Sequence, residues 1–194
     1  MGVENKTVVL GIGNLLMKDE GAGVHAVSIL KENFSFSPEV TVMDGGTMGL
    51  DLLYFLEGAE KLLMIDAVSS GAPAGTVKIC EGDDIPPSAW GKFSVHQIGL
   101  QDLVTAMRLT GQEPPQICLA GIEPRDVCLE IGLSPEVEKG LPALIETVIK
   151  KLGQWGVEAR RKKGYKARKM KLNFSVNQDY NIYNVSGDSL PDSR

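Results

Sequence analysis

The sequence predicts an α/β fold: a three-layer α/β/α sandwich around a mostly parallel, five-stranded sheet with one antiparallel strand. Three observations support this prediction. Strand-like and helix-like segments alternate through residues 1–158, the first strand-like run is apolar throughout, and one connection is too short for a crossover helix. The 194-residue length and the 43% hydrophobic content suit one domain with one core.

The segments before residue 44 are predicted to form a strand, a helix and a second strand. Residues 7–12 are a β-branched and apolar run, typical of a strand that is buried on both faces. Residues 23–32 have apolar side chains at positions 24, 27 and 30, which is helical spacing. Residues 39–43 predict the second strand.

The middle of the chain predicts a helix followed by two strands. Residues 47–57 have apolar side chains at helical spacing, and Thr47 is a suitable N-cap. Residues 62–65 are the third strand, and residues 76–80 are the next strand-like run. Because the connection over residues 66–75 is too short for a helical crossover, we expect this run to lie antiparallel to its neighbour.

The last predicted elements are a helix, a fifth strand and a long helix. Residues 98–109 form an amphipathic helix and residues 117–121 an apolar strand. Ser134 is a good N-cap, followed by Pro and Glu in the first turn, so a helix is expected from there to about residue 155. Pro142 is a candidate position for a kink.

The chain divides by charge into an acidic body and a basic tail. Residues 159–194 carry a net charge of +6, whereas residues 1–158 carry −11. Residues 160–171 hold eight basic residues, and the polar end beyond them has few apolar anchors. We therefore expect residues 1–158 to be the folded domain and residues 159–194 to be a disordered tail. Because no aromatic platform or wide amphipathic face accompanies the charge, a solvated extension is favoured over nucleic-acid or membrane binding.

Composition and cysteine usage indicate a cytoplasmic protein. No apolar run approaches the roughly 18–20 residues that a membrane span needs, and no secretory signal is evident. Cys80, Cys118 and Cys128 show no paired spacing, so neither a disulfide framework nor a zinc knuckle is expected. All three lie among apolar residues and are predicted to be buried and reduced. No heptad or paired apolar patch is visible, so a monomer is expected.

The glycine-rich segment over residues 11–23 does not fit a nucleotide-binding loop. Gly11 and Gly13 begin a dinucleotide fingerprint, but Leu16 stands where the third glycine belongs, and no Walker sequence follows. The acidic pair Asp19-Glu20 would also repel phosphate. This pair, flanked by glycines, is better suited to a cation or to a polar substrate.

Acidic residues follow three of the predicted strands. Glu20 lies after the first strand, Asp44 after the second and Asp66 after the third. Ligands of open α/β sheets bind beyond the carboxyl ends of the strands, so these groups are expected at one rim, with His96 just before a helix. Taken singly, each has an ordinary structural explanation. Together, Glu20, Asp66 and His96 supply two carboxylates and an imidazole, which suits a divalent first-row ion with open coordination positions.

From about residue 7 to residue 158 the chain resembles the maturation endopeptidases of nickel–iron hydrogenases. The matching elements, in chain order, are Gly11-Ile12-Gly13-Asn14, Asp19-Glu20, Gly23-Val24, Asp44-Gly45-Gly46-Thr47, Asp66-Ala67, His96-Gln97 with Gly99-Leu100, Gly121-Ile122 with Pro124, and Gly132-Leu133-Ser134. Each element alone is modestly specific, whereas the ordered set is strongly specific. The resemblance places the family's metal-contacting trio on Glu20, Asp66 and His96, and a further family acid on Asp44.

The resemblance implies a hydrolase that removes the C-terminal extension of a hydrogenase large-subunit precursor. The reaction would be metal-assisted or aspartyl-type endoproteolysis. The precursor would bring its own nickel, and no permanently bound metal is expected in the protease. Two alternatives remain open: a nickel-dependent checkpoint protein that binds the precursor without cutting it, and a conventional zinc metallopeptidase, although no HExxH sequence is present.

Overall fold

The five predicted strands form one sheet in the computed structural model, which describes residues 6–85 and 100–162. Its strand order is β3-β1-β4-β6-β5. The strands are β1 (Thr7–Ile12), β3 (Val40–Gly46), β4 (Lys61–Ala67), β5 (Val77–Glu81) and β6 (Gln116–Ile122). The first three and β6 run parallel, and β5 runs antiparallel to β6. The predicted fold class is confirmed, and the antiparallel neighbour of β5 is β6, which separates it from β4.

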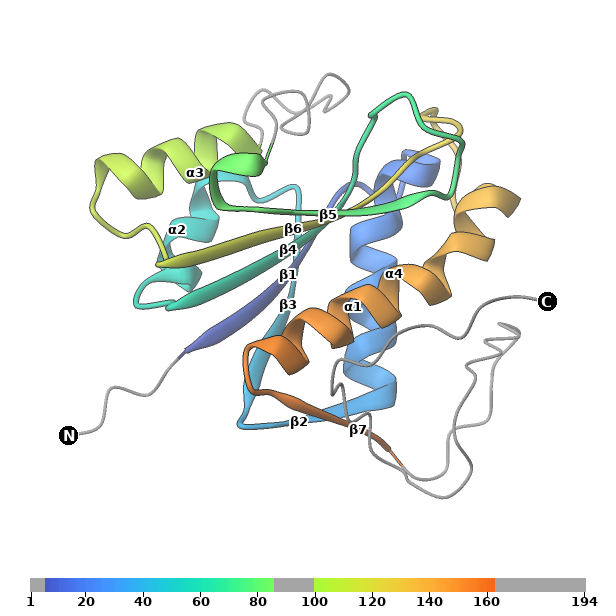
Figure 1. Ribbon diagram of the computed structural model, residues 1–194. Helices are drawn as coiled ribbons and strands as arrows, with labels where there is room; N and C mark the ends of the chain where they lie inside the picture. The colour runs from blue at the N-terminus through green and yellow to red at the C-terminus, as the bar shows by residue number, and fades with distance from the viewer. Residues whose placement is uncertain (1–5, 86–99, 163–194) are drawn as a thin grey trace.

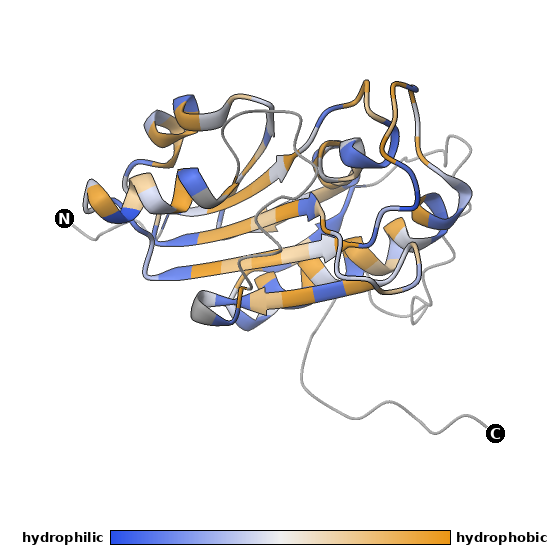
Figure 2. Cartoon of the chain, turned by 90° about the horizontal axis from the view of Figure 1, so that it is seen from above, coloured by the Kyte–Doolittle hydropathy of each residue, from blue (hydrophilic) through white to orange (hydrophobic). Residues whose placement is uncertain are grey.

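Helices cover both faces of the sheet, as Figure 1 shows. One face carries α1 (Ala22–Asn33) and α4 (Pro135–Gln154), and the other carries α2 (Leu52–Leu56) and α3 (Leu100–Leu109). Because successive side chains of a strand point to opposite faces, Val9 packs in the core with α1 and α4, whereas Val8 and Leu10 pack with α2 and α3. The central strands are mostly hydrophobic (Figure 2), as expected of a sheet covered on both sides.

The described chain also contains three short 3-10 turns: η1 (Lys18–Gly21), η2 (Gly49–Asp51) and η3 (Gly82–Asp84). The turn η1 leads into α1, η2 leads into α2, and η3 follows β5. The position of η2 accounts for one wrong prediction. Thr47 does not cap a helix, because the chain first forms η2, which has no side-chain cap. The Ser134 cap is confirmed, since its Oγ accepts a hydrogen bond from the Val137 N–H.

A second, two-stranded sheet was not predicted from the sequence. Strand β2 (Phe34–Ser37) pairs antiparallel with β7 (Glu158–Arg161) at the far end of the molecule from the loops that follow β1, β4 and β6 (Figure 1). Phe34 and Ala159 are buried in the α1–α4 core. The predicted domain boundary at residue 158 therefore falls inside β7, and the packed chain continues to at least Lys162, whose N–H donates to the Asn33 carbonyl. The remainder of the expected tail, residues 163–194, lies outside the described residues.

Two further sequence predictions concern the cysteines and membrane spans. Cys118 is buried, Cys80 is intermediate and Cys128 is exposed, so the prediction that all three are buried is wrong for Cys128. In the part of the chain that the structure describes, no helix is long and apolar enough to cross a membrane.

Candidate active site

Glu20 lies in the turn η1, directly against the ends of two central strands. Glu20 is only 8% exposed. Two glycines make this close packing possible. A Cβ on Gly13, whose φ is +129°, would lie 1.8 Å from the Glu20 carbonyl oxygen. A Cβ on Gly23 would lie 2.2 Å from the Ile65 carbonyl oxygen. Any larger residue at these positions would push η1 and the start of α1 away from the sheet, so the glycines place Glu20 at the rim.

Asp66 lies at the carboxyl end of β4, beside Gly121 of β6. Its Oδ1 accepts a hydrogen bond from the Ala67 N–H at 2.7 Å. Burial, with a smaller contribution from the nearby Glu20 carboxylate, raises the pKa of Asp66 to about 8, against the opposing effect of the Ala67 N–H. The structure therefore brings Glu20 and Asp66 together, as the sequence predicted from the strand ends.

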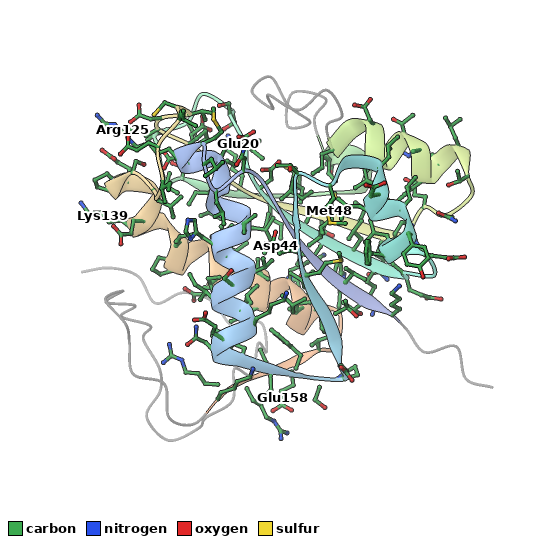
Figure 3. The ribbon with its side chains drawn as sticks, turned by 180° about the vertical axis from the view of Figure 1, so that it is seen from behind. Glu20, Asp44, Met48, Arg125, Lys139 and Glu158 are labelled. Atoms are coloured by element: carbon green, nitrogen blue, oxygen red, sulfur yellow. The ribbon has the colours of Figure 1, made fainter. Side chains whose placement is uncertain are left out.

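Asp44 lies near the end of β3, beside Gly11 of β1, and is exposed to solvent. Figure 3 labels Glu20 on the turn that precedes α1 and Asp44 on β3. The Asp44 Oδ1 accepts a hydrogen bond from the Gly46 N–H at 2.9 Å, and the Gly46 carbonyl accepts one from the Gly13 N–H at 3.1 Å. These bonds join the Asp44 turn to the loop that leads to Glu20. Asp44 thus sits at the same rim, in a more open position.

His96, the third predicted ligand, lies outside the described residues. Within residues 6–85 and 100–162, no three His, Cys, Asp or Glu side chains form a group that could hold a metal ion. The described portion of the site is a pair of carboxylates, whose mutual repulsion contributes to the raised pKa of Asp66. A divalent cation between such groups would relieve this repulsion, and their oxygens are suitable ligands for it. The oxygens of Glu20 and Asp66 are therefore suitable ligands for a divalent cation.

Asp19, the other half of the acidic pair, has a structural role that the sequence analysis missed. It is fully buried. Its Oδ2 accepts hydrogen bonds from the N–H groups of Arg125 at 2.9 Å and Asp126 at 3.0 Å, and its Oδ1 accepts one from the Ser134 N–H at 2.6 Å. Burial opposes ionisation, but these donors outweigh it, so the pKa of Asp19 is lowered. Asp19 thereby ties η1 to the loop before α4. No local signal could have found this role, because its partners are more than 100 positions away.

Glu123 performs a similar task on the other side of the rim and was also missed. Its carboxylate accepts hydrogen bonds from the Ser70 N–H at 2.8 Å, the Ser70 hydroxyl at 2.7 Å and the Gly71 N–H at 3.2 Å. The side chain is buried at the end of β6. Burial again opposes ionisation, and the donors again lower the pKa of Glu123. Glu123 thereby holds the loop that follows Asp66.

The chain is similar to known hydrogenase-processing proteins over most of its length. Residues 24–151 match the model of a family described as hydrogenase maturation protease. The hydrogenase expression/formation protein HupD of Rhizobium leguminosarum bv. viciae is 39% identical, over 78% of this chain and 76% of its own. The hydrogenase 2 maturation protease of Escherichia coli is 37% identical, over 79% of this chain and 94% of its own. The solved structure of the E. coli hydrogenase maturating endopeptidase HybD superposes with a TM-score of 0.75 at 35% identity, covering 81% of this chain and 98% of that one.

Proposed function

This chain belongs to the hydrogenase maturation protease family, and on that premise we propose how its site acts. The family makes it an endopeptidase that processes a hydrogenase large-subunit precursor. We propose that it removes the C-terminal extension of a precursor that already carries nickel, and that Glu20, Asp66 and His96 receive this nickel. The observation that carries the proposal is the pairing of the Glu20 and Asp66 carboxylates at the sheet rim.

In this proposal the nickel arrives as part of the substrate. When bound, it supplies positive charge that polarises the carbonyl of the scissile bond. The carboxylates of Glu20 and Asp66 and the imidazole of His96 hold it, and so fix the position of the nearby peptide, a proximity effect that contributes several kcal/mol, on the order of 7–11 at best. Asp44, exposed at the same rim, is available to orient the peptide or to accept a proton. The expected monomeric state, cytoplasmic location and solvated tail are part of the same proposal.

The decisive experiment compares nickel-loaded and nickel-free precursor as substrates of the purified protein. Mass spectrometry of the large subunit should show a shortened product only with the loaded form. Efficient cutting of the nickel-free form would contradict the nickel requirement. A zinc ion held tightly by each purified chain, removable only with loss of activity, would favour the conventional zinc metallopeptidase. Binding of the precursor without any shortening would favour the checkpoint protein.

Substitutions at the trio test the ligand assignment. Glu20→Gln, Asp66→Asn and His96→Ala should each abolish processing, because each removes a proposed nickel ligand. None of them creates a large cavity, so the fold should be retained. Asp51→Asn is a matched control, since Asp51 is an exposed carboxylate on η2. It should process at the wild-type rate. Titration calorimetry with Ni²⁺ alone should show weak binding to the wild type and weaker binding to the trio variants. A trio variant with wild-type processing and wild-type Ni²⁺ binding would remove that residue from the site.

A further inference from the structure

The backbone of Lys18, the first residue of the turn η1, has an unusual conformation. Its φ is +51°, and among the described residues no other residue except glycine has a positive φ. This left-handed conformation is disfavoured for a residue with a Cβ, so it persists only where the surrounding structure holds it. The Lys18 N–H donates a hydrogen bond to the Glu130 carbonyl at 2.8 Å. The loop before α4 therefore helps to hold this conformation, although it lies 112 positions away in the chain.

The Lys18 side chain binds the same loop a second time. Its ammonium donates a hydrogen bond to the Glu130 carboxylate at 3.0 Å and lies 3.5 Å from the Asp126 carboxylate. The Lys18 side chain is 17% exposed, whereas those of Asp126 and Glu130 are 47% and 58% exposed. A largely covered cation thus joins two more exposed carboxylates of the loop to the start of η1.

Glu20 follows Lys18 in the same turn, with only Asp19 between them. The Glu20 N–H donates to the Met17 carbonyl at 3.2 Å, so the turn closes around Lys18. Asp19 holds the turn to the loop from the buried side, through the three hydrogen bonds described above. Lys18 holds the turn to the same loop from the solvent side. Because its ion pairs are partly exposed, they should contribute little to the free energy of unfolding, and their main effect is on geometry.

We propose that Lys18 is a positioning residue that fixes the Glu20 carboxylate at the rim of the sheet. The proposal rests on the proposed function, in which Glu20 is a ligand of the precursor's nickel. The ammonium keeps the loop in place, the loop holds the left-handed backbone of Lys18, and that backbone directs Glu20 toward the strand ends. A displacement of about 1 Å at a reacting centre can lower the rate roughly 100-fold. The loss of Lys18 should therefore affect processing far more than stability.

The charge of Lys18 and its positioning role predict opposite effects on metal binding. Lys18→Met removes a positive charge two residues from Glu20 and keeps a long, unbranched side chain. If charge alone mattered, Ni²⁺ would bind more tightly to this variant, because like charges repel. If Lys18 positions Glu20, Ni²⁺ binds more weakly even though the repulsion is gone.

The test measures the binding of Ni²⁺ alone to the full-length chain by titration calorimetry. Lys18→Met should weaken this binding about tenfold, as is typical when a partner of a metal ligand is removed. Lys18→Arg keeps a cation that can bond both carboxylates, so its affinity should be within about twofold of the wild-type value. Lys139→Met is the matched control, because Lys139 is an exposed lysine of α4 (Figure 3). It should bind Ni²⁺ as the wild type does.

Two further variants show whether Lys18 acts through Glu20 and guard against misfolding. In a Glu20→Gln background, Lys18→Met should cause no additional weakening of Ni²⁺ binding, because the ligand that it positions is already lost. Lys18→Gly tolerates the left-handed backbone, so it should fold even if Lys18→Met does not, and it should show the same weakened binding. Denaturant midpoints of Lys18→Arg, Lys18→Gly and Lys139→Met should be close to that of the wild type.

Processing of nickel-loaded precursor gives a second measurement. Lys18→Met should lower kcat/KM at least about tenfold, and Lys18→Arg should recover most of it. Unchanged or tighter Ni²⁺ binding in folded Lys18→Met or Lys18→Gly, no recovery in Lys18→Arg, or a further loss in the Glu20→Gln background would overturn the proposal. If Glu20→Gln itself binds Ni²⁺ as the wild type does, the ligand assignment of the proposed function fails. If Glu20→Gln binds weakly and the Lys18 variants bind normally, only the positioning role fails.

Discussion

Besides Asp44, the carboxylates at the sheet rim form two pairs with different environments: Asp19 with Glu123, and Glu20 with Asp66. Asp19 and Glu123 are each surrounded by hydrogen-bond donors, and the pKa of each is lowered despite burial. Asp66 accepts a hydrogen bond from the Ala67 N–H and lies near the charge of Glu20, and burial raises its pKa to about 8. Asp19 and Glu123 hold loops in place, whereas burial and the charge of Glu20 disfavour the ionised form of Asp66. Strongly shifted pKa values of this kind are common at functional sites.

The comparison shows that neighbours in sequence can have opposite roles. Asp19 and Glu20 are adjacent and chemically similar, yet one is buried under three backbone N–H groups and the other lies beside a second carboxylate. Asp19 and Glu123 hold the loops on both sides of Glu20 and Asp66. We therefore expect processing to depend on Asp19 and Glu123 indirectly, through the geometry that they maintain.

The largest expected effect comes from removing a stabilising carboxylate. Asp19→Ala should lower the free energy of unfolding by about 3–5 kcal/mol, because three backbone N–H groups lose their acceptor and are left without a hydrogen bond. Glu20→Gln should change stability by less than about 1 kcal/mol. Urea unfolding followed by circular dichroism measures both.

Asp19→Asn separates the role of shape from that of charge. It keeps one acceptor oxygen but places an amide N–H₂ against backbone donors, so it should recover only part of the loss. Equal stability of Asp19→Ala and the wild type would contradict the assignment of Asp19 to the stabilising pair. A stability loss in Glu20→Gln as large as that in Asp19→Ala would erase the distinction between the pairs.

Most of the main sheet could be predicted because its signals are local. Continuous apolar runs mark β1 and β4, and the short connection after Asp66 indicated an antiparallel strand. The small β2–β7 sheet was missed because β7 reads Glu-Ala-Arg-Arg, in which only Ala159 is buried. Its charges suggested a solvated tail, whereas the strand is stabilised by pairing with a segment more than 120 positions earlier.

The site could be predicted in part for the same reason. The order of strand ends indicated that Glu20 and Asp66 share a rim, and in the structure the charge of Glu20 is near enough to raise the pKa of Asp66. Spacing alone could not reveal which way Asp19 points in a 3-10 turn or which distant loop it would meet. The roles of Glu20, Asp44, Asp66 and His96 stay predictions that substitution can test.

A smaller effect on the free energy of unfolding is expected from removing the charge of Asp66. The folded-state pKa of Asp66, about 8, lies above its ordinary value of 3.8. The folded state therefore binds the proton more tightly, and its stability should fall as pH rises from about 4 to 8. Asp66→Asn removes this dependence, so its free energy of unfolding relative to that of the wild type should rise by up to about 4 kcal/mol between pH 5 and pH 8, at about 1.36 kcal/mol per pH unit. Chemical denaturation at both pH values, with a chelator present to exclude divalent ions, gives the comparison.

If the free energy of unfolding depends on pH in the same way in the wild type and in Asp66→Asn, the raised pKa of Asp66 is contradicted. A further check is Asp66→Asn measured without chelator in added Ni²⁺. The wild type should gain stability from the ion, whereas the variant should gain less, because it has lost one ligand.

The smallest effect should have the opposite sign and belongs to Glu123. Its folded-state pKa is lowered, because the Ser70 and Gly71 donors outweigh the cost of burial. The contribution of the ionised group is therefore complete above its unfolded-state value near 4.5 and is lost as pH falls through the folded-state value. Glu123→Gln should cost about 1 kcal/mol at pH 7 and less at pH 3, where the wild type has itself lost part of that contribution. Denaturant midpoints at the two pH values measure the change. A cost that grows toward low pH would place Glu123 with Asp66 among the unfavourable carboxylates, and the division of the rim into two pairs would no longer hold.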